Sequence, residues 1–112
     1  MDRDPLDPIV RDAAIQRFEY TYETAWRTVR RAVGEASGED PRRLPLHEVF
    51  RVAAELGWID DPRSWFEYKE WRNETAHLYD EDKARVVFNR LGRFRDDGRR
   101  LLDRLRAAFP EP

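Results

Sequence analysis

The sequence predicts an all-α fold, an antiparallel up-and-down four-helix bundle, on three observations. Apolar residues recur at intervals of three and four along most of the chain, as they do on one face of a helix. No segment keeps up the alternation of apolar and polar residues that marks a half-buried strand. Asp-Pro pairs and glycines divide the helical pattern into four segments. The chain has 112 residues, so we expect residues 1–112 to form a single helical bundle domain.

The first predicted helix covers about residues 8–33. Asp7 followed by Pro8 is typical of a helix start, with a capping side chain before a proline in the first turn. The apolar stripe of this helix consists of Ile9, Val10, Ala13, Ala14, Phe18, Tyr22, Ala25, Trp26, Val29 and Val33. Residues 34–45, with the sequence GEASGEDPRRLP, combine glycines and prolines with polar neighbours. We therefore expect them to form the connection to the next helix.

The second predicted helix covers about residues 46–56. Its inward positions are Val49, Phe50, Ala53 and Leu56. Gly57 is expected to end it as a C-terminal cap, because glycine tolerates the left-handed conformation that such caps require. Trp58 and Ile59 are then expected to turn into the core.

Asp61 followed by Pro62 repeats the start signal and opens a third helix, which runs to about Ala76 or His77. Asp80 is suited to cap a fourth. The inner positions of this last helix are Ala84, Val87, Phe88, Leu91, Phe94, Leu101, Leu102, Leu105 and Phe109. Gly98 lies within that pattern and leaves a kink or a break open. The first and last helices are the longest and are expected to pair.

Composition excludes several classes of protein. The chain has no cysteine, which rules out disulfides, thiolate metal sites and a cysteine nucleophile. No segment approaches the roughly 20 apolar residues of a membrane-spanning helix. The acidic first ten residues contain no apolar signal region. We therefore expect a cytoplasmic protein that does not insert into membranes.

The charges are divided along the chain. Residues 55–82 carry nine acids and three bases, whereas residues 85–106 carry eight arginines and three aspartates. An arginine-rich face is suited to bind phosphates. The alternative is that the two segments face one another in the fold or form solvated ion-pair networks.

The segment WRNETAHLYD, residues 71–80, carries the candidate site. Asn73 lies four residues before His77 and thus on the same helical face, while Arg72 lies about 140° around an ideal helix from His77. Metal-free RNA cleavage needs a base, an acid and a cation at the phosphate. Histidine can fill either proton-transfer role, and arginine matches phosphate oxygens. Since one chain supplies one such histidine, the two roles suggest two chains at a composite site.

A structural role for these residues stays open. A histidine near a helix C-terminus is stabilised by the helix dipole, and Arg72 could pair with Glu67, Glu70 or Glu74. We interpret His47, which has no partner at an informative spacing, as a surface residue. The same three glutamates could bind a hard cation, but we expect a solvated acidic face, no metal site and no cofactor.

Three stretches resemble a known family. RNETAHLY resembles the Arg-x4-His-x-Tyr motif of HEPN-family proteins. IQRFEYTYETAWRTVRR is similar to the first helix of the HepT-like nucleotidyltransferase substrate-binding proteins. LPLHEVFRVAAELGWIDDPRSW is similar to their second helix and the start of the third. The resemblance covers most of residues 9–95.

The resemblance implies a helical bundle that forms a homodimer or a higher homo-oligomer and associates with a minimal nucleotidyltransferase. It implies a metal-independent ribonuclease toxin, with the partner as antitoxin. His77 would then be the general acid or base, Arg72 would bind the scissile phosphate, and Asn73 would position it. Tyr79 would accept AMP from the partner. The alternative is a non-catalytic subunit that presents a nucleotide or another substrate to the nucleotidyltransferase.

Overall fold

The computed structural model describes residues 8–75 and 81–110. Over these ranges the chain forms four α-helices, α1 (Pro8–Ser37), α2 (Leu46–Glu55), α3 (Pro62–Thr75) and α4 (Glu81–Ala108), and no strand. A short 3-10 helix, η1 (Pro41–Arg43), lies between α1 and α2. The predicted all-α four-helix bundle is confirmed. The predicted caps Asp7 and Asp80 lie outside the described residues.

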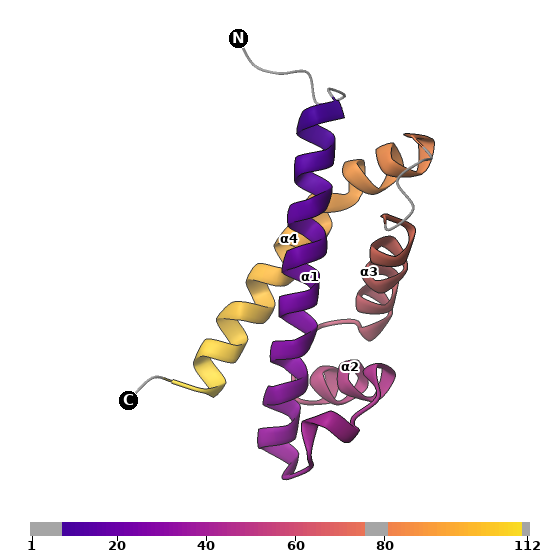
Figure 1. The fold of residues 1–112 in the computed structure, drawn as a ribbon. Coiled ribbons are helices and arrows are strands. Elements are labelled where there is room, and N and C mark those ends of the chain that lie inside the picture. Colours follow the sequence, from indigo (N-terminus) through magenta and orange to yellow (C-terminus); the bar gives the residue numbers. More distant parts are fainter. Residues whose placement is uncertain (1–7, 76–80, 111–112) are drawn as a thin grey trace.

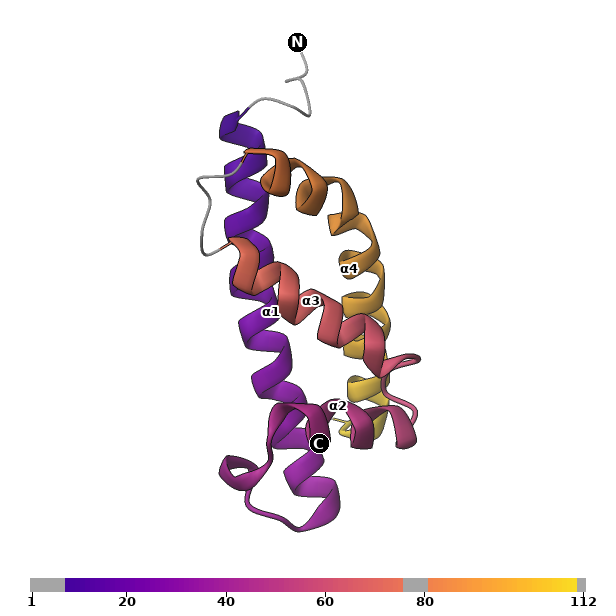
Figure 2. The same cartoon turned by 90° about the vertical axis from the view of Figure 1, so that its right-hand side faces the viewer.

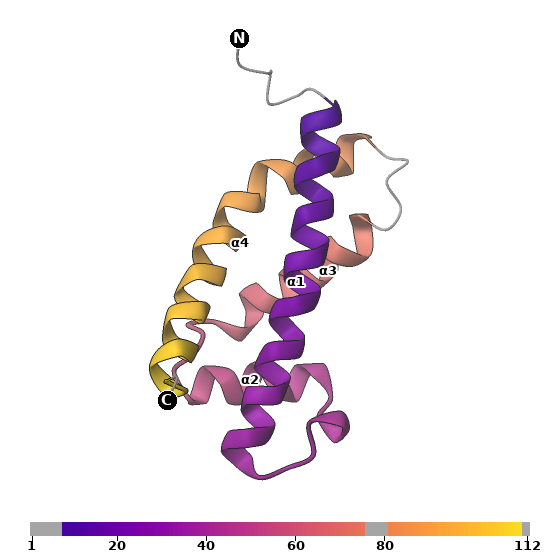
Figure 3. The same ribbon diagram turned by 60° about the vertical axis from the view of Figure 1, so that its left-hand side comes forward.

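The helices are arranged around α1, which packs against each of the others (Figure 1). α1 and α4 run in the same general direction and cross, while α3 runs back along one side of the pair and packs against both (Figures 1 and 2). The short α2 lies across the C-terminal end of α1 (Figure 3). None of the helices in the described ranges is long and apolar enough to span a bilayer.

The core is built largely from aromatic rings. The Phe94 ring of α4 lies 4.9 Å from Phe18 of α1 and 5.1 Å from Tyr68 of α3, measured between ring centroids. Both contacts are edge-to-face, an arrangement that aromatic pairs favour. Trp58 and Ile59 are buried, as predicted. Large aromatic side chains therefore fix α3 against both long helices.

Local start and stop signals are confirmed where the structure describes them. The Asp61 carboxylate accepts a hydrogen bond of 2.9 Å from the backbone N–H of Arg63, and α3 begins at Pro62. This hydrogen bond, with that from the Arg63 side chain, lowers the pKa of Asp61. Gly57 has a φ of 78° and follows α2 as the predicted cap. Such signals act within a few residues, so the sequence predicts them well.

The predicted end of α1 is wrong. α1 continues through Gly34 to Ser37, and Gly38, with a φ of 77°, follows its last residue. Gly34 is needed for another reason: a Cβ there would lie 2.5 Å from Cγ of Pro41. The glycine allows the returning chain to pack against α1, so it marks a close approach instead of a helix end.

Several residues predicted to point inward are exposed, because the core faces are narrower than the predicted stripes. On α1, Ile9 is 69% exposed and Ala13 is also exposed, whereas Ile15, absent from the predicted stripe, is fully buried. Leu56 is 45% exposed, whereas Trp58 and Ile59, which follow the turn at Gly57, are buried. On α4, Leu102 is 47% exposed beside the buried Leu101. A shift of one residue rotates a side chain by about 100°.

The last helix is unbroken at Gly98, which lies within the continuous α4. Its ribbon bends between the orange and yellow parts (Figures 1 and 2). Phe109, predicted as an inner position, lies just past the helix end and is 41% exposed, although its ring contacts that of Trp58 at 5.7 Å.

Candidate functional site

Arg72 lies in the last turn of α3 and reaches across to α1. Its NH1 atom is 3.3 Å from a carboxylate oxygen of Glu19, and its Nε is 3.4 Å from one of Glu23. The two glutamates are four residues apart, so both carboxylates lie on one side of α1. The Arg72 side chain is 29% exposed. The two ion pairs therefore fix the position of the Arg72 guanidinium, and the side chain is still partly accessible to solvent.

Sequence reasoning missed Glu19 and Glu23. It considered as partners of Arg72 only glutamates of its own helix, Glu67, Glu70 and Glu74. Nothing in the spacing of the motif points to α1, because this contact joins positions about fifty residues apart. The sequence feature that could have indicated this contact is weak: Glu19 and Glu23 are four residues apart, on one side of the first helix and beside its apolar stripe.

Glu23 connects Arg72 to a second group of side chains on α1. The indole N–H of Trp26 donates to the Glu23 carboxylate at 3.1 Å, and NH2 of Arg27 lies 3.7 Å from it. The Cζ atom of Arg30 lies 4.8 Å from the centroid of the Trp26 ring, and that of Arg27 lies 5.6 Å away. The candidate arginine therefore belongs to a network of charged and aromatic groups.

The motif residues are described only in part. Asn73 follows Arg72 and is exposed. His77 and Tyr79 lie outside the described residues. The convergence of Arg72, Asn73 and His77 at one site thus stays a prediction, as does the role of Tyr79. His47 is exposed, which confirms its assignment to the surface.

The turns of α3 before Arg72 are anchored to α4. The buried Tyr68 donates a hydrogen bond from its hydroxyl to Asp97. Burial raises the pKa of Tyr68, and the hydrogen bond to Asp97 raises it further. Arg93 pairs with Glu67 at 2.8 Å, and its guanidinium lies 5.5 Å from the Tyr68 ring and 5.8 Å from the Trp71 ring. These contacts hold the helix that carries Arg72.

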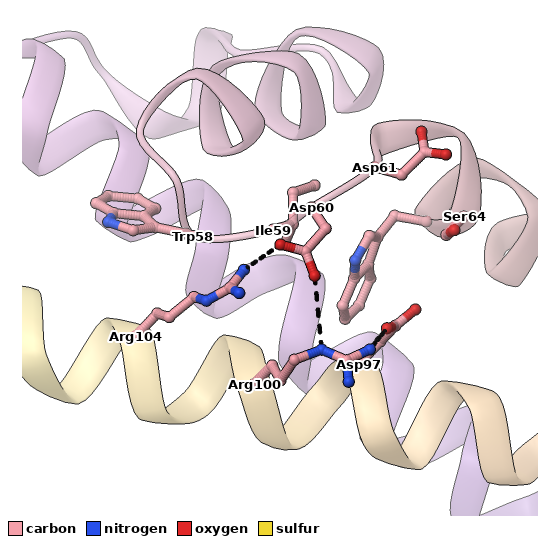
Figure 4. Close-up of a pocket in the computed structure, with 9 residues that line it drawn as sticks. Trp58, Ile59, Asp60, Asp61, Ser64, Asp97, Arg100 and Arg104 are labelled. Atoms are coloured by element: carbon pink, nitrogen blue, oxygen red, sulfur yellow. Dashed lines mark hydrogen bonds and ion pairs between the residues drawn. The ribbon is translucent and has the colours of Figure 1, made fainter.

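The acidic and arginine-rich segments do face one another. Figure 4 shows Asp60 between two arginines of α4. One carboxylate oxygen lies 3.6 Å from Nε of Arg100, and the other lies 2.8 Å from NH1 of Arg104. Together with the Glu67–Arg93 pair, these contacts confirm the alternative in which the two segments form ion pairs. The hollow drawn in Figure 4 has a cavity volume of about 40 Å³. It has room for water but not for a nucleotide, since small-molecule sites are roughly 300 Å³ or larger.

The ion pairs between the acidic segment, residues 55–82, and the arginine-rich segment, residues 85–106, involve only some of the arginines. Arg85, Arg90, Arg99 and Arg106 of α4 are exposed and form no ion pair with the residues that the structure describes. Among those residues, no group of three or more histidine, cysteine, aspartate or glutamate side chains could hold a metal ion. The available cations of α4 are suited to bind phosphates.

Comparison with known proteins gives one family and one curated relative. The model of a family described as nucleotidyltransferase substrate binding protein like matches residues 1–107. A Haemophilus influenzae protein named "Probable ribonuclease HepT" is 32% identical over 95 residues. That match covers 83% of this chain and 65% of the relative, so the chain spans less than two thirds of the relative's length.

Two solved structures share the fold. A Haemophilus influenzae structure described as the fold of a substrate binding domain of a nucleotidyltransferase superposes with a TM-score of 0.83 at 30% identity. The superposed region covers 88% of this chain and 74% of the Haemophilus chain. A Thermus thermophilus crystal structure gives a TM-score of 0.81 at 36% identity, covering 95% and 88% of the two chains.

Proposed function

The chain belongs to the nucleotidyltransferase substrate binding protein like family, and from this premise we propose that it is a metal-independent ribonuclease. We propose further that it is the toxin of a toxin–antitoxin pair whose antitoxin is a minimal nucleotidyltransferase. The observation that carries the proposal is the position of Arg72, held by Glu19 and Glu23 at the end of α3 beside the exposed Asn73. The name of the curated relative, a probable ribonuclease, supports the same activity.

Each motif residue has a role in the proposed reaction. A neutral His77 removes the proton from a ribose 2′-hydroxyl, and the 2′-oxygen attacks the adjacent phosphorus. The bond from phosphorus to the 5′-oxygen breaks, and a protonated His77 supplies the proton to that leaving oxygen. Arg72 stabilises the charge that builds up on the phosphate, and Asn73 orients a phosphate oxygen.

Two histidines in one site require two chains, so the proposal includes a homodimer or a higher homo-oligomer. The exposed apolar side chains of α1 support an interface between copies. Tyr20 is 75% exposed and Ile9 is 69% exposed, and in the proposed dimer a second copy covers them.

The second candidate function is that of a non-catalytic subunit that binds a nucleotide or another substrate for the nucleotidyltransferase. In this candidate Arg72 links α3 to α1 through Glu19 and Glu23 and does not bind a scissile phosphate. The description of the Haemophilus structure as a substrate binding domain supports it. The exposed arginines of α4 fit either candidate.

Cleavage assays with the purified, unmodified protein separate the two candidates. We expect RNA to be cut in the presence of excess EDTA, since no step of the proposed reaction uses a metal. The products should end in a 2′,3′-cyclic phosphate and a 5′-hydroxyl, which treatment with phosphatase and kinase distinguishes from other ends. If no RNA is cut without the partner, the subunit that only binds substrate becomes the better candidate.

Tyr79 provides a separate test of the partnership. Incubation with the nucleotidyltransferase partner and ATP is expected to add AMP to its hydroxyl, with release of pyrophosphate. Intact mass spectrometry should show an increase by whole AMP units, and a Tyr79→Phe variant should show none. An unchanged wild-type mass would remove the modification from the proposal and leave the nuclease untouched.

A further inference from the structure

Trp26 differs from the other tryptophans of the chain, all of which lie in the described ranges. Trp58, Trp65 and Trp71 are 7%, 2% and 4% exposed. Trp26 is only partly buried and packs against the edge of the core. Its indole N–H is bound to Glu23 at 3.1 Å, so the ring is held in a defined orientation at the surface of α1.

Two arginines lie on this ring. Arg30 is closer, with its Cζ atom 4.8 Å from the ring centroid, and it forms no ion pair with the residues that the structure describes. Arg27 lies 5.6 Å from the centroid, and its side chain is 68% exposed. Arg30 is partly buried and its guanidinium makes a cation–π contact with the indole, which it can exchange for the stronger charged hydrogen bonds that a phosphate offers.

The surroundings of Trp26 favour an anion. Glu19 and Glu23 contribute two negative charges, and Arg27, Arg30 and Arg72 contribute three positive charges. The group therefore carries one positive charge in excess. Because Glu23 contacts both Trp26 and Arg72, one carboxylate links the indole to the guanidinium that is proposed to bind the scissile phosphate.

We propose that Trp26 and Arg30 form a subsite for a nucleotide that flanks the scissile phosphate in single-stranded RNA. The indole stacks on the base, and the Arg30 guanidinium binds the adjoining phosphate. Stacking on an aromatic side chain and a cation at the backbone are the two contacts by which proteins hold single strands without reading their sequence. This inference rests on the RNA substrate of the proposed function.

Binding can be measured without cleavage in the His77→Ala background, with a short fluorescein-labelled single-stranded oligoribonucleotide and fluorescence anisotropy. Trp26→Leu and Arg30→Gln are each expected to weaken the affinity about tenfold, as the loss of a base stack or a phosphate contact does. The matched control is Arg31→Gln, which removes the neighbouring exposed arginine of the same helix. Its affinity should stay within about twofold of the background.

Intrinsic fluorescence gives a second measurement that does not depend on the stability of the variants. Since the other tryptophans are buried, a change of emission on addition of unlabelled RNA should come from Trp26. The change of emission should disappear in both Trp26→Leu and Trp26→Phe, because each variant lacks the indole. Unchanged affinity in both Trp26→Leu and Arg30→Gln would overturn the subsite.

The subsite and the nuclease can fail separately. If the wild-type protein cuts no RNA but the Trp26→Leu and Arg30→Gln variants still lose binding, the nuclease is refuted and the subsite stands. If the wild type cuts RNA and both variants bind and cut as it does, the subsite is refuted and the nuclease stands.

Discussion

Replacement of His77 by alanine is expected to lower the rate of RNA cleavage by about 10²–10⁴-fold, because a positioned general acid or base contributes that much to proton transfer. The residual rate should come from binding of the phosphate by Arg72. The measurement is the initial rate on a labelled RNA, in EDTA, at equal protein concentrations.

His47 supplies the matched control, since it is the other histidine of the chain and is exposed on α2. A His47→Ala variant should cut RNA at the wild-type rate. Circular dichroism should show the same helix content in both variants. If His77→Ala cuts as fast as His47→Ala, His77 has no catalytic role. Substitution of Arg72 is a less direct test, because it also leaves Glu19 and Glu23 without their shared cation.

Truncation of Trp65 to alanine is expected to lower the free energy of unfolding by about 3–5 kcal/mol, the usual cost of removing a buried tryptophan side chain. Trp65 is 2% exposed, and its ring lies 5.7 Å from that of Phe50, 5.3 Å from Tyr68 and 5.9 Å from Phe94. One substitution thus loosens contacts of α3 with both α2 and α4. Urea denaturation followed by circular dichroism gives the change.

The comparison is with Phe109→Ala, which also truncates an aromatic ring but at a position that is 41% exposed. Its cost should be roughly 1 kcal/mol, in proportion to the smaller apolar area that it buries. Equal costs for the two variants would contradict the central place of Trp65 in the core. A large loss in Trp65→Ala would also disturb Arg72, which lies two helical turns further along α3.

The sequence predicted well those features that depend on neighbouring residues. Asp61 and Pro62 fix the start of α3, and Gly57 ends the turn after α2, since caps are satisfied within a few positions. Burial of Phe18, Tyr22 and Phe94 follows from their place in apolar stripes. The motif from Arg72 to Tyr79 was likewise visible as a local pattern, and the family match agrees with the resemblance that it suggested.

Features that join distant parts of the chain were predicted poorly. Gly34 was placed in the connection after the first helix, whereas it lies within α1 where Pro41 approaches closely. Leu102 was predicted to be an inner position but is exposed, because the spacing of apolar residues along the chain does not fix how wide the buried face of α4 is. The pairing of Arg72 with Glu19 and Glu23 depends on how α3 crosses α1, which no spacing within either helix specifies.

By itself, then, the sequence determined that the chain forms helices, approximately where they begin and end, and which short segment carries the candidate chemistry, because these depend on interactions within one or two helical turns. Only the tertiary structure decided that Glu19 and Glu23 of α1 are the carboxylates that hold Arg72 of α3. Those contacts arise when helices pack, and packing is set by the shapes of whole faces that meet from separate parts of the chain.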